Sequence, residues 1–303
     1  MNEENTIFDV IIIGGSYAGL SAAMSLGRSL RRVLIIDHGQ PCNKQTPHSH
    51  NFITQDGEKP SLIAEKAKKQ VLAYDSIQFL NDEAIAVQSM DKHFIIKTKS
   101  TKTFTASKVV LATGIKDLMP DIPGFSNCWG ISVVHCPYCH GYEAKNQKTG
   151  ILMNGEVAFH ITQLVYNLSK DLRILTNGPS NFSSEQTKKL SSKGIEIIEK
   201  KVQEITQENG VLKAVIFSDN TSISLEVLYA RLPFEQSSSI INQLGCECNE
   251  LGYLKVDQFQ MTTVKGVYAC GDNSSPMRSV ANAVASGNLV GALINKELSE
   301  VAF

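Results

Sequence analysis

Two cysteines separated by two residues are the part of the sequence best suited to chemistry. They lie in the run HCPYCHG (135–141). Cys136 and Cys139 at this spacing can close a small disulfide ring and cycle between the dithiol and the disulfide. His140 follows directly, and an imidazole that titrates near neutral pH can donate a proton to a leaving thiolate or stabilise it. The run therefore predicts a redox-active dithiol with Cys136, Cys139 and His140 as catalytic residues.

Three other interpretations of this run are weaker. A cysteine pair followed by histidine is also the attachment signature of c-type haem, but that modification belongs to exported proteins and the sequence shows no export segment. The CPYC tetrad equals that of glutaredoxins, where it lies near the start of a much shorter chain. A zinc site needs a second ligand pair, and Cys246 and Cys248 are only one residue apart. We therefore expect no metal.

A glycine-rich turn is the second feature with a chemical use. The run GGSYAG (14–19) offers Gly14 for a tight turn and Gly19 for close packing of a helix on a strand, while Ser16 replaces the usual middle glycine and the adjacent Gly15 permits close backbone approach. Asp37 lies 18 residues after Gly19, near the spacing of a carboxylate that binds ribose hydroxyls. The predicted nucleotide-binding residues here are Gly14, Gly15, Ser16, Ala18, Gly19 and Asp37.

The elements around this turn form a recognisable unit. Val10–Ile13 is an apolar run typical of a buried strand, a helical pattern follows from Leu20 to about Leu30, and Val33–Ile36 is a second apolar run. A strand, a glycine turn, a helix, a strand and an acid make the first half of a dinucleotide-binding fold. Further predicted elements are a helix over 60–74, strands over 77–87, 94–98 and 108–112, and a helix over 280–298.

A second, similar pattern lies in the middle of the chain. Ile151–Met153 predicts a strand and Val157–Leu168 a helix, and Leu172–Leu175, Ile195–Ile198 and a hairpin turning at 208–210 complete a smaller unit. We expect an α/β protein with two Rossmann-like three-layer dinucleotide-binding domains, one inserted in the other. The predicted outer domain comprises 1–116 and 231–303, and the inserted domain comprises 117–230.

Composition excludes several classes of protein. The 303 residues are 42% hydrophobic, as in ordinary globular proteins. Because 29 Lys and Arg balance 30 Asp and Glu, we do not expect the protein to bind nucleic acid. The longest early apolar run has four residues, too few for a signal peptide or a membrane span. We expect a soluble, cytoplasmic protein without membrane contact, whose odd number of cysteines indicates reduced thiols, some of them reactive, and not a framework of structural disulfides. Cys42, Cys128 and Cys270 are expected to be buried apolar groups.

The order of these motifs resembles the low-molecular-weight thioredoxin reductases over essentially the whole chain. The resemblance rests on GGSYAG (14–19), ATG (112–114), the cysteine pair between the two nucleotide units, and GD (271–272). It implies a homodimer with an FAD domain built from both chain ends and an inserted pyridine-nucleotide domain. It also implies that Cys139 faces the flavin, Cys136 attacks the partner disulfide, and Asp272 binds the FAD ribityl or pyrophosphate region. Further cofactor-binding candidates are Asn51, Ala112, Thr113, Gly114, Gly271 and Val280.

The function expected from this resemblance is a two-electron relay. A reduced pyridine nucleotide, NADP(H) or NAD(H), reduces the flavin, which passes electrons to the Cys136–Cys139 disulfide. The dithiol then reduces a thioredoxin-like protein or a small-molecule disulfide through a mixed disulfide. The enzyme would thus be an FAD-dependent dithiol–disulfide oxidoreductase.

Two departures from the family pattern leave alternatives open. His140 stands where the family has aspartate, and HGYE (140–143) resembles a subset of dithiol oxidases. In the inserted domain, Met153 replaces the first glycine, and TNG (176–178) stands where NADPH-dependent members place arginines. Losing two charge-assisted contacts weakens 2′-phosphate recognition by about 3–6 kcal/mol. The alternatives are a dithiol oxidase using oxygen, a reductase with a donor other than NADPH, and a non-catalytic redox sensor.

Overall fold

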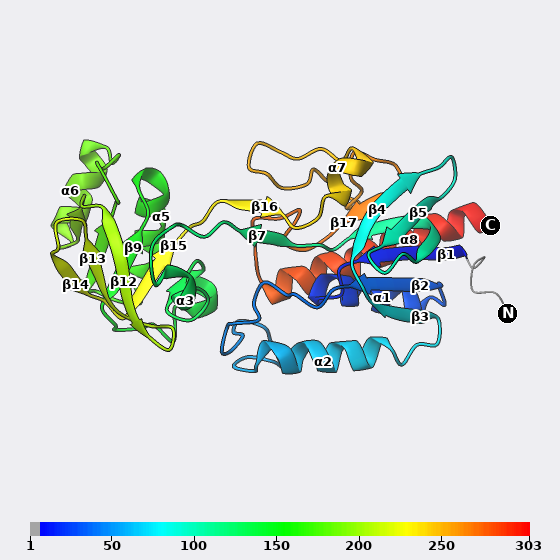
Figure 1. Ribbon diagram of the computed structural model, residues 1–303, viewed down its shortest axis with the longest axis horizontal. Coiled ribbons are helices and arrows are strands. Elements are labelled where there is room, and N and C mark those ends of the chain that lie inside the picture. The colour runs from blue at the N-terminus through cyan, green and yellow to red at the C-terminus, as the bar shows by residue number, and fades with distance from the viewer. Residues whose placement is uncertain (1–6) are drawn as a thin grey trace. The chain divides into compact units, whose positions relative to one another are not determined.

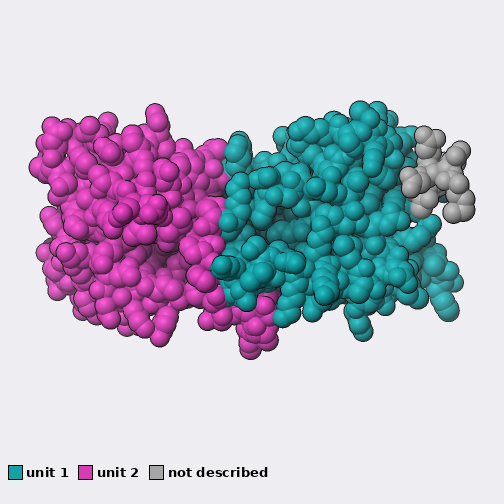
Figure 2. Space-filling view, turned by 60° about the horizontal axis from the view of Figure 1, so that its bottom comes forward, with its two compact units in different colours: residues 1–44, 58–116, 234–303 teal, residues 45–57, 117–233 magenta. Residues whose placement is uncertain are grey.

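The computed structural model describes residues 7–303, so the first six residues of the predicted outer domain lie outside it. The chain divides into two compact units, coloured separately in Figure 2. Unit 1 comprises residues 1–44, 58–116 and 234–303, and unit 2 comprises residues 45–57 and 117–233. The short segment 45–57 thus packs with unit 2, although it lies in the sequence between two parts of unit 1.

Unit 1 is built on a seven-stranded sheet (Figure 1). Its buried centre is parallel and its far edge is an antiparallel hairpin extension. The strand order is β3 (Ile77–Asn81), β2 (Val33–Asp37), β1 (Ile7–Ile13), β6 (Thr103–Leu111), β5 (Phe94–Thr98) and β4 (Ala84–Ser89), with β17 (Val267–Ala269) also paired to β6. Because β1, β2, β6 and β17 run parallel, their carboxyl ends meet at one edge, where ligands of such sheets bind.

Helix α1 (Tyr17–Arg28) is fixed by helix α8 (Val280–Ala302). A Cβ at Gly287 would overlap the Ala18 carbonyl oxygen, and one at Gly291 would lie 2.5 Å from the Ser25 Cβ. The two helices therefore touch along their backbones. The Ser21 hydroxyl also donates to the Val284 carbonyl at 2.7 Å. This contact holds the N-terminus of α1 in place at the edge of the sheet.

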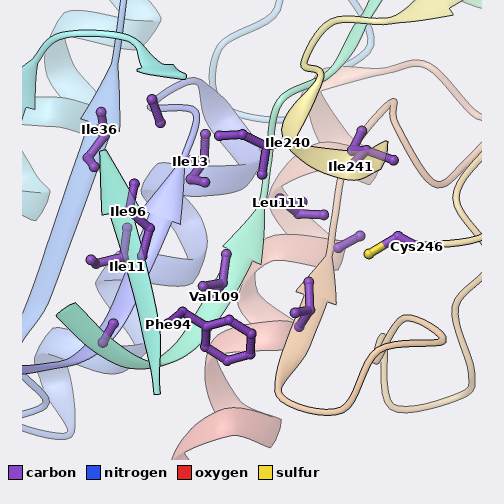
Figure 3. Packing of buried hydrophobic residues seen from close by; sticks show 14 of the residues in the cluster. Ile11, Ile13, Ile36, Phe94, Ile96, Val109, Leu111, Ile240, Ile241 and Cys246 are labelled. Carbon is purple, nitrogen blue, oxygen red and sulfur yellow. The ribbon is translucent and has the colours of Figure 1, made fainter. Parts of the chain in front are cut away.

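The core of unit 1 joins the sheet to the short helix α7 (Ile240–Leu244) and the chain near it (Figure 3). Ile11 and Val109 are fully buried in the central strands, and Ile240 and Cys246 pack against the same cluster. Cys246 is therefore a core residue. Helix α2 (Pro60–Val71) contributes the buried Ile63 and Val71.

Unit 2 contains a second parallel sheet of five strands. Its order is β11 (Glu196–Ile198), β10 (Leu172–Leu175), β9 (Thr149–Leu152), β15 (Val227–Ala230) and β8 (Val133–Val134). Helices α5 (Gly155–Val165) and α6 (Ser184–Ser192) follow β9 and β10, and an antiparallel sheet is formed by β12 (Val202–Glu208), β13 (Val211–Phe217) and β14 (Ser222–Ser224). Short helices α3 (Phe125–Cys128) and α4 (Pro137–His140) precede β9, and β7 (Ile115–Asp117) pairs with β16 (Phe234–Gln236). The predicted α/β class with two Rossmann-like sheets is confirmed.

Several predicted elements differ in detail. The stretch 77–87 is two strands, because Asp82 bonds to Ser100 between them and β4 pairs with β5 instead of continuing β3. Cys42 is exposed, contrary to expectation, while Cys128 and Cys270 are buried as predicted. Within residues 7–303, no helix combines the length and the apolar character needed to cross a membrane.

Candidate active site

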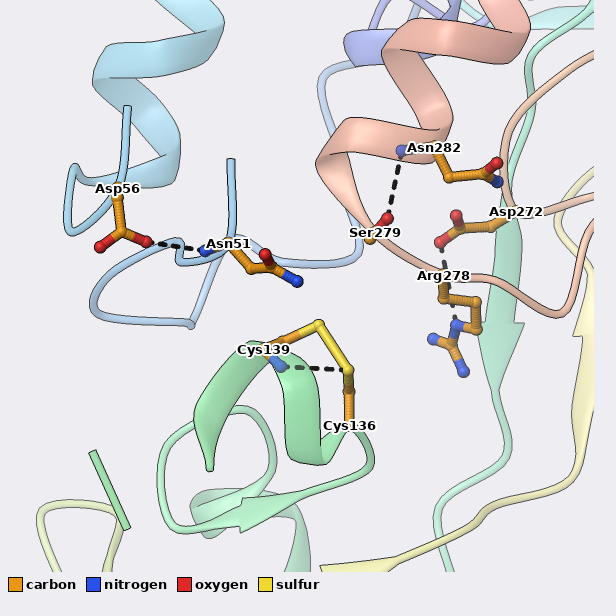
Figure 4. The surroundings of a disulfide bond; sticks show 8 residues. All are labelled: Asn51, Asp56, Cys136, Cys139, Asp272, Arg278, Ser279 and Asn282. Carbon is orange, nitrogen blue, oxygen red and sulfur yellow. Dashed lines mark hydrogen bonds and ion pairs between the residues drawn. A yellow bond between two sulfur atoms is a disulfide. The ribbon is translucent and has the colours of Figure 1, made fainter. Parts of the chain in front are cut away.

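The cysteine pair forms a disulfide at the start of α4 (Figure 4). Pro137 begins the helix, where its missing N–H costs no hydrogen bond. Cys136 is the N-cap residue, and its Sγ accepts the Cys139 amide at 3.2 Å. The Cα atoms are 5.3 Å apart, within the ordinary range for a disulfide. The two cysteines predicted to act together are thus brought together, in a short turn that can cycle between dithiol and disulfide.

His140 is partly buried at the end of the same short helix. Burial lowers its pKa, the neighbouring His50 lowers the pKa further, and Glu143 acts in the opposite sense. Because both larger causes disfavour the imidazolium, His140 is neutral at pH 7. A neutral imidazole directly after Cys139 is able to accept a thiol proton.

The N-terminus of α1 is open to an anion. A Cβ at Gly14 would overlap the Ala112 carbonyl oxygen, and one at Gly19 would overlap the Gly14 carbonyl oxygen, so both positions require glycine. Ser16 is the N-cap but makes no side-chain cap bond, and the first turn of α1 holds no acidic residue. The first amides of a helix have no partner within it, and together with the helix dipole they favour a phosphate. The arrangement fits the diphosphate of a dinucleotide.

Asp37 lies at the carboxyl end of β2, beside this turn. Its Oδ1 accepts the Gly15 amide at 2.9 Å and its Oδ2 accepts the Gly39 amide at 3.0 Å. A Cβ at Gly15 would lie 2.8 Å from the Asp37 Cβ, so only glycine allows this approach. Each carboxylate oxygen keeps a further lone pair, so Asp37 can accept ribose hydroxyls while it remains bonded to the turn.

The other carboxyl ends of the sheet supply the remaining predicted residues of unit 1. Ala112, Thr113 and Gly114 follow β6, and Gly271 and Asp272 follow β17. The amide of Ala112 donates to the Ile13 carbonyl at 2.8 Å, and that of Cys270 to the Leu111 carbonyl at 3.1 Å, which aligns these strand ends. The structure therefore gathers these residues, Gly14–Gly19 and Asp37 at one edge of one sheet.

Asp272 and Val280 lie near the start of α8. The Asp272 Oδ2 is 3.8 Å from the Arg278 Nε, and both side chains are largely buried (Figure 4). Ser279 caps α8 by accepting the Asn282 amide at 3.1 Å, so Val280 is the first helical residue. Asn273, which the sequence did not single out, is fully buried, and its Nδ2 donates to the Leu111 carbonyl at 2.8 Å. Asn273 therefore ties the GD motif to the end of β6.

Asn51 lies in the segment 45–57 and thus belongs to unit 2. It is exposed, has a positive φ of 58°, and its amide donates to the Asp56 Oδ1 at 2.7 Å (Figure 4). The observed interaction of Asn51 is therefore within its own loop.

The N-terminus of α5, which corresponds in unit 2 to that of α1, carries a side-chain cap and a carboxylate. Asn154 is the N-cap residue, and its Oδ1 accepts the amides of Gly155 and Asn181, both at 2.8 Å. Its Nδ2 donates to the Pro179 carbonyl at 2.8 Å. Glu156 adds a carboxylate in the first turn, where its Oε2 accepts from the Gln186 side chain. A phosphate at this position would meet a satisfied cap and a like charge.

The loop after β10 lacks cations for a 2′-phosphate. The Thr176 hydroxyl donates to the Gly178 carbonyl at 2.6 Å, and the Asn177 Oδ1 accepts the Val202 amide at 2.8 Å. Nearby, the Glu199 carboxylate accepts the Ser180 amide at 2.8 Å, and hydrogen bonding by the Ser180 side chain, together with that of its amide, lowers the pKa of Glu199. The side-chain oxygens of Thr176 and Asn177 are therefore already hydrogen-bonded, and the loop itself contains no Lys or Arg.

Sequence reasoning missed three residues of the second unit, Asn154, His50 and Glu143. Asparagine before the first helical residue is a recognised N-cap signal, so the role of Asn154 was accessible from the sequence. His50 approaches the cysteine helix only through folding, because 86 residues separate it from Cys136. Within the part of the chain that the structure describes, no cluster of three metal-binding side chains occurs.

Comparisons with known proteins agree with this geometry. The family model for pyridine nucleotide-disulphide oxidoreductases matches residues 8–287. Thioredoxin reductase tcpT of Claviceps purpurea is 32% identical over 97% of this chain and 95% of the relative, and thioredoxin reductase sirT of Leptosphaeria maculans is 32% identical over 96% and 94%. Among solved structures, a putative thioredoxin reductase TrxB from Bacillus anthracis has a TM-score of 0.92 at 33% identity, covering 98% of this chain and 100% of the other.

Proposed function

We propose that this protein works mainly as an oxidase of dithiols, which it converts to disulfides. The chain belongs to the pyridine nucleotide-disulphide oxidoreductase family and is a thioredoxin reductase-like enzyme. The substrate is a small-molecule or thioredoxin-like dithiol, which leaves as a disulfide. The observation that supports this proposal is the N-terminus of α5, where Asn154 caps the helix and Glu156 adds a carboxylate that disfavours a pyridine-nucleotide diphosphate. The electrons therefore enter through the dithiol.

The family implies FAD, and the residues at the sheet edge of unit 1 fit it. Gly14, Gly15, Ser16, Ala18 and Gly19 would hold the diphosphate at the start of α1, and Asp37 would bind the ribose. Ala112–Gly114, Gly271, Asp272 and Val280 are the further binding residues in this proposal, and Asn51 is a weaker one. When bound, FAD would accept the two electrons of the enzyme dithiol and pass them to oxygen.

The protein's own residues carry out the thiol chemistry. A substrate thiol loses its proton to His140, and its thiolate attacks Cys136, which forms a mixed disulfide and releases the Cys139 thiolate. The proton returns from His140 to Cys139. The second substrate thiol then attacks the substrate sulfur of the mixed disulfide, and its proton passes to the released Cys136 thiolate, so the substrate leaves as a disulfide and the Cys136–Cys139 pair is left as a dithiol. Two electrons and two protons have moved from the substrate to the enzyme.

A second candidate is a reductase that acts on a thioredoxin-like protein. It is favoured by the relatives, because tcpT and sirT carry the name thioredoxin reductase and align over almost the whole chain. The same cysteines would then run in reverse. The electron donor in that case would be NADPH, NADH or another reductant.

Replacement of one cysteine tests the assignment of the dithiol. Cys139→Ser should abolish turnover with a dithiol such as dithiothreitol, because no enzyme disulfide can form, while flavin remains bound. Cys42→Ser is the matched control, since Cys42 is exposed and lies outside α4. Turnover is measured as oxygen consumption and as disulfide formed. Full turnover by Cys139→Ser would refute the assigned relay.

A further inference from the structure

Two exposed tyrosines lie on the same turn of unit 2 as the disulfide. Tyr138 and Tyr142 are each 69% exposed. The chain has eight tyrosines, all within the described residues, and the other six are buried or half-buried. Among the tyrosines, exposure to solvent is therefore confined to the turn that carries the reactive sulfurs.

The backbone of this turn makes the two rings neighbours. The Gly141 amide donates to the Pro137 carbonyl at 2.8 Å, which continues the helical turn of α4. Residues four apart on such a turn adjoin on its surface, as Tyr138 and Tyr142 do. A different face of the turn is packed, since a Cβ at Gly141 would lie 2.4 Å from the Leu168 Cδ1. The turn is therefore held on its inner side while the two rings face solvent.

Cys139 adjoins both rings. It directly follows Tyr138 in the chain, and Tyr142 lies three residues further, a spacing that also makes neighbours on a helical surface. Cys139 is bonded to Cys136 at the start of the same turn (Figure 4). In the proposed exchange, the substrate becomes bonded to Cys136 in a mixed disulfide. The body of the substrate is then within reach of the two tyrosine rings.

A lysine holds one of these rings in place. The Lys145 Nζ lies 3.8 Å from the centroid of the Tyr142 ring, which is the geometry of a cation–π contact. The ammonium group covers one face of the ring, so a flat group can stack on the other face. Stacked or edge-to-face aromatic pairs are stabilised beyond the area that they bury. Tyr142 therefore offers a positioned surface for an aromatic group.

We propose that Tyr138 and Tyr142 are specificity-determining residues, whose rings stack on a flat aromatic body that carries the substrate thiols. This inference rests on the proposed function, since it names the kind of dithiol that the enzyme takes. The size of the surface favours a small molecule. Stable protein–protein interfaces cover about 800 Å² on each partner, whereas two tyrosine side chains offer at most about 300–500 Å².

Two dithiols of different character test the proposal. Dithiothreitol has an aliphatic body and ortho-benzenedimethanethiol an aromatic one, with the same number of carbon atoms between the thiols. The preference is the ratio of their second-order rate constants for anaerobic reduction of the Cys136–Cys139 disulfide, followed by acid quenching and thiol labelling. Dividing the preference of a variant by that of the parent protein removes the difference in intrinsic reactivity between the two dithiols.

The variants separate the aromatic rings from the rest of the turn. Tyr138→Ser and Tyr142→Ser should each lower the preference for the aromatic dithiol about two- to tenfold. Tyr138→Phe and Tyr142→Phe keep the ring and should keep the preference. Phe259→Ser is the matched control, because it removes an exposed ring from unit 1 and should also keep the preference. Flavin content is measured in every variant and should equal that of the parent protein.

The outcomes distinguish the role of the rings from the direction of electron flow. An unchanged preference in both serine variants, or an equal fall in Phe259→Ser, would overturn the proposal. Loss of flavin from the serine variants would also overturn it, because the rings would then serve the cofactor. If the preference falls as expected but neither dithiol drives oxygen consumption in air, the proposed oxidase direction fails and the role of the two rings stands.

Discussion

The N-termini of α1 and α5 occupy equivalent places in two similar units but differ in chemistry. Each helix follows a buried parallel strand, but Gly14 and Gly15 lie in the turn before α1, whereas Gly155 is the first residue of α5. Helix α1 begins without a side-chain cap or an acidic residue, whereas α5 begins with the Asn154 cap and Glu156. The second unit therefore has a Rossmann-like sheet whose first helix begins with a side-chain cap and a negative charge, which disfavour a phosphate there.

The groups of unit 2 that are suited to chemistry lie away from the start of α5. Its useful groups are the disulfide of α4 and the histidines near it, and these lie on a segment that precedes the sheet strand β9. Strand β8 of the Rossmann-like sheet leads directly into α4, and so fixes where α4 begins. Fold and function are thus separable within a single chain.

The largest effect is expected from replacing a glycine near the start of α1 or α5 by alanine. Gly19→Ala places a Cβ against the Gly14 carbonyl, so the turn must deform, and we expect a loss of roughly 3–5 kcal/mol in the free energy of unfolding together with loss of flavin. Gly155→Ala meets no atom closer than 3.6 Å and bears only the strain of a φ of +59°, about 1–2 kcal/mol. Urea unfolding and flavin content measure both. Similar losses in the two variants would contradict the distinction between the turns.

A smaller effect is expected from substitutions at the carboxyl ends of β2 in unit 1 and β10 in unit 2. Asp37→Ala removes a charged acceptor for ribose and for the Gly15 amide, and should weaken flavin binding by about 2–3 kcal/mol, a roughly 30- to 150-fold loss of affinity. Thr176→Val, directly after β10, removes hydroxyl bonds to the Gly178 and Ile198 carbonyls within unit 2 and should leave flavin affinity unchanged. Reconstitution of flavin-free protein gives both affinities. Equal affinity in Asp37→Ala and the parent protein would rule out the assigned role.

The charge at the start of α5 offers a milder test. Glu156→Gln removes a carboxylate from the helix N-terminus, which favours an anion by about 0.3–1 kcal/mol, so the affinity for NADPH should rise only about two- to fivefold. Glu185→Gln makes the same change in the first turn of α6 and should have no effect on NADPH binding. Calorimetric titration compares the variants with the parent protein. Tight NADPH binding by the parent protein would show that Asn154 and Glu156 do not block the site.

The smallest effect concerns stability and pH. The pKa of His140 is lowered in the folded state, so below about 6.5, the ordinary value, the unfolded chain binds more protons than the folded chain. Stability should therefore fall as the pH drops from that value through the lowered pKa, and should be independent of His140 above it. His140→Gln should flatten this slope, as measured by urea unfolding at a series of pH values. An unchanged slope would remove His140 as a buried titrating group.

The sequence predicted best what local patterns determine. The turn at 14–19, Asp37 and the cysteine pair were all identified from spacing, and β10 was predicted with its observed bounds. The approach of His50 to Glu143 depends on a loop that packs against a segment far along the chain, which no local pattern reports. The division of 77–87 into β3 and β4 likewise depends on strand partners distant in sequence.

Anaerobic reduction of the bound flavin tests the central claim most directly. The purified holoenzyme is titrated in parallel with dithiothreitol and with NADPH, and the flavin absorbance is followed. The Asn154 cap and the Glu156 carboxylate at the start of α5 predict rapid bleaching of the flavin by the dithiol and little bleaching by NADPH. Rapid, stoichiometric bleaching by NADPH would contradict the account.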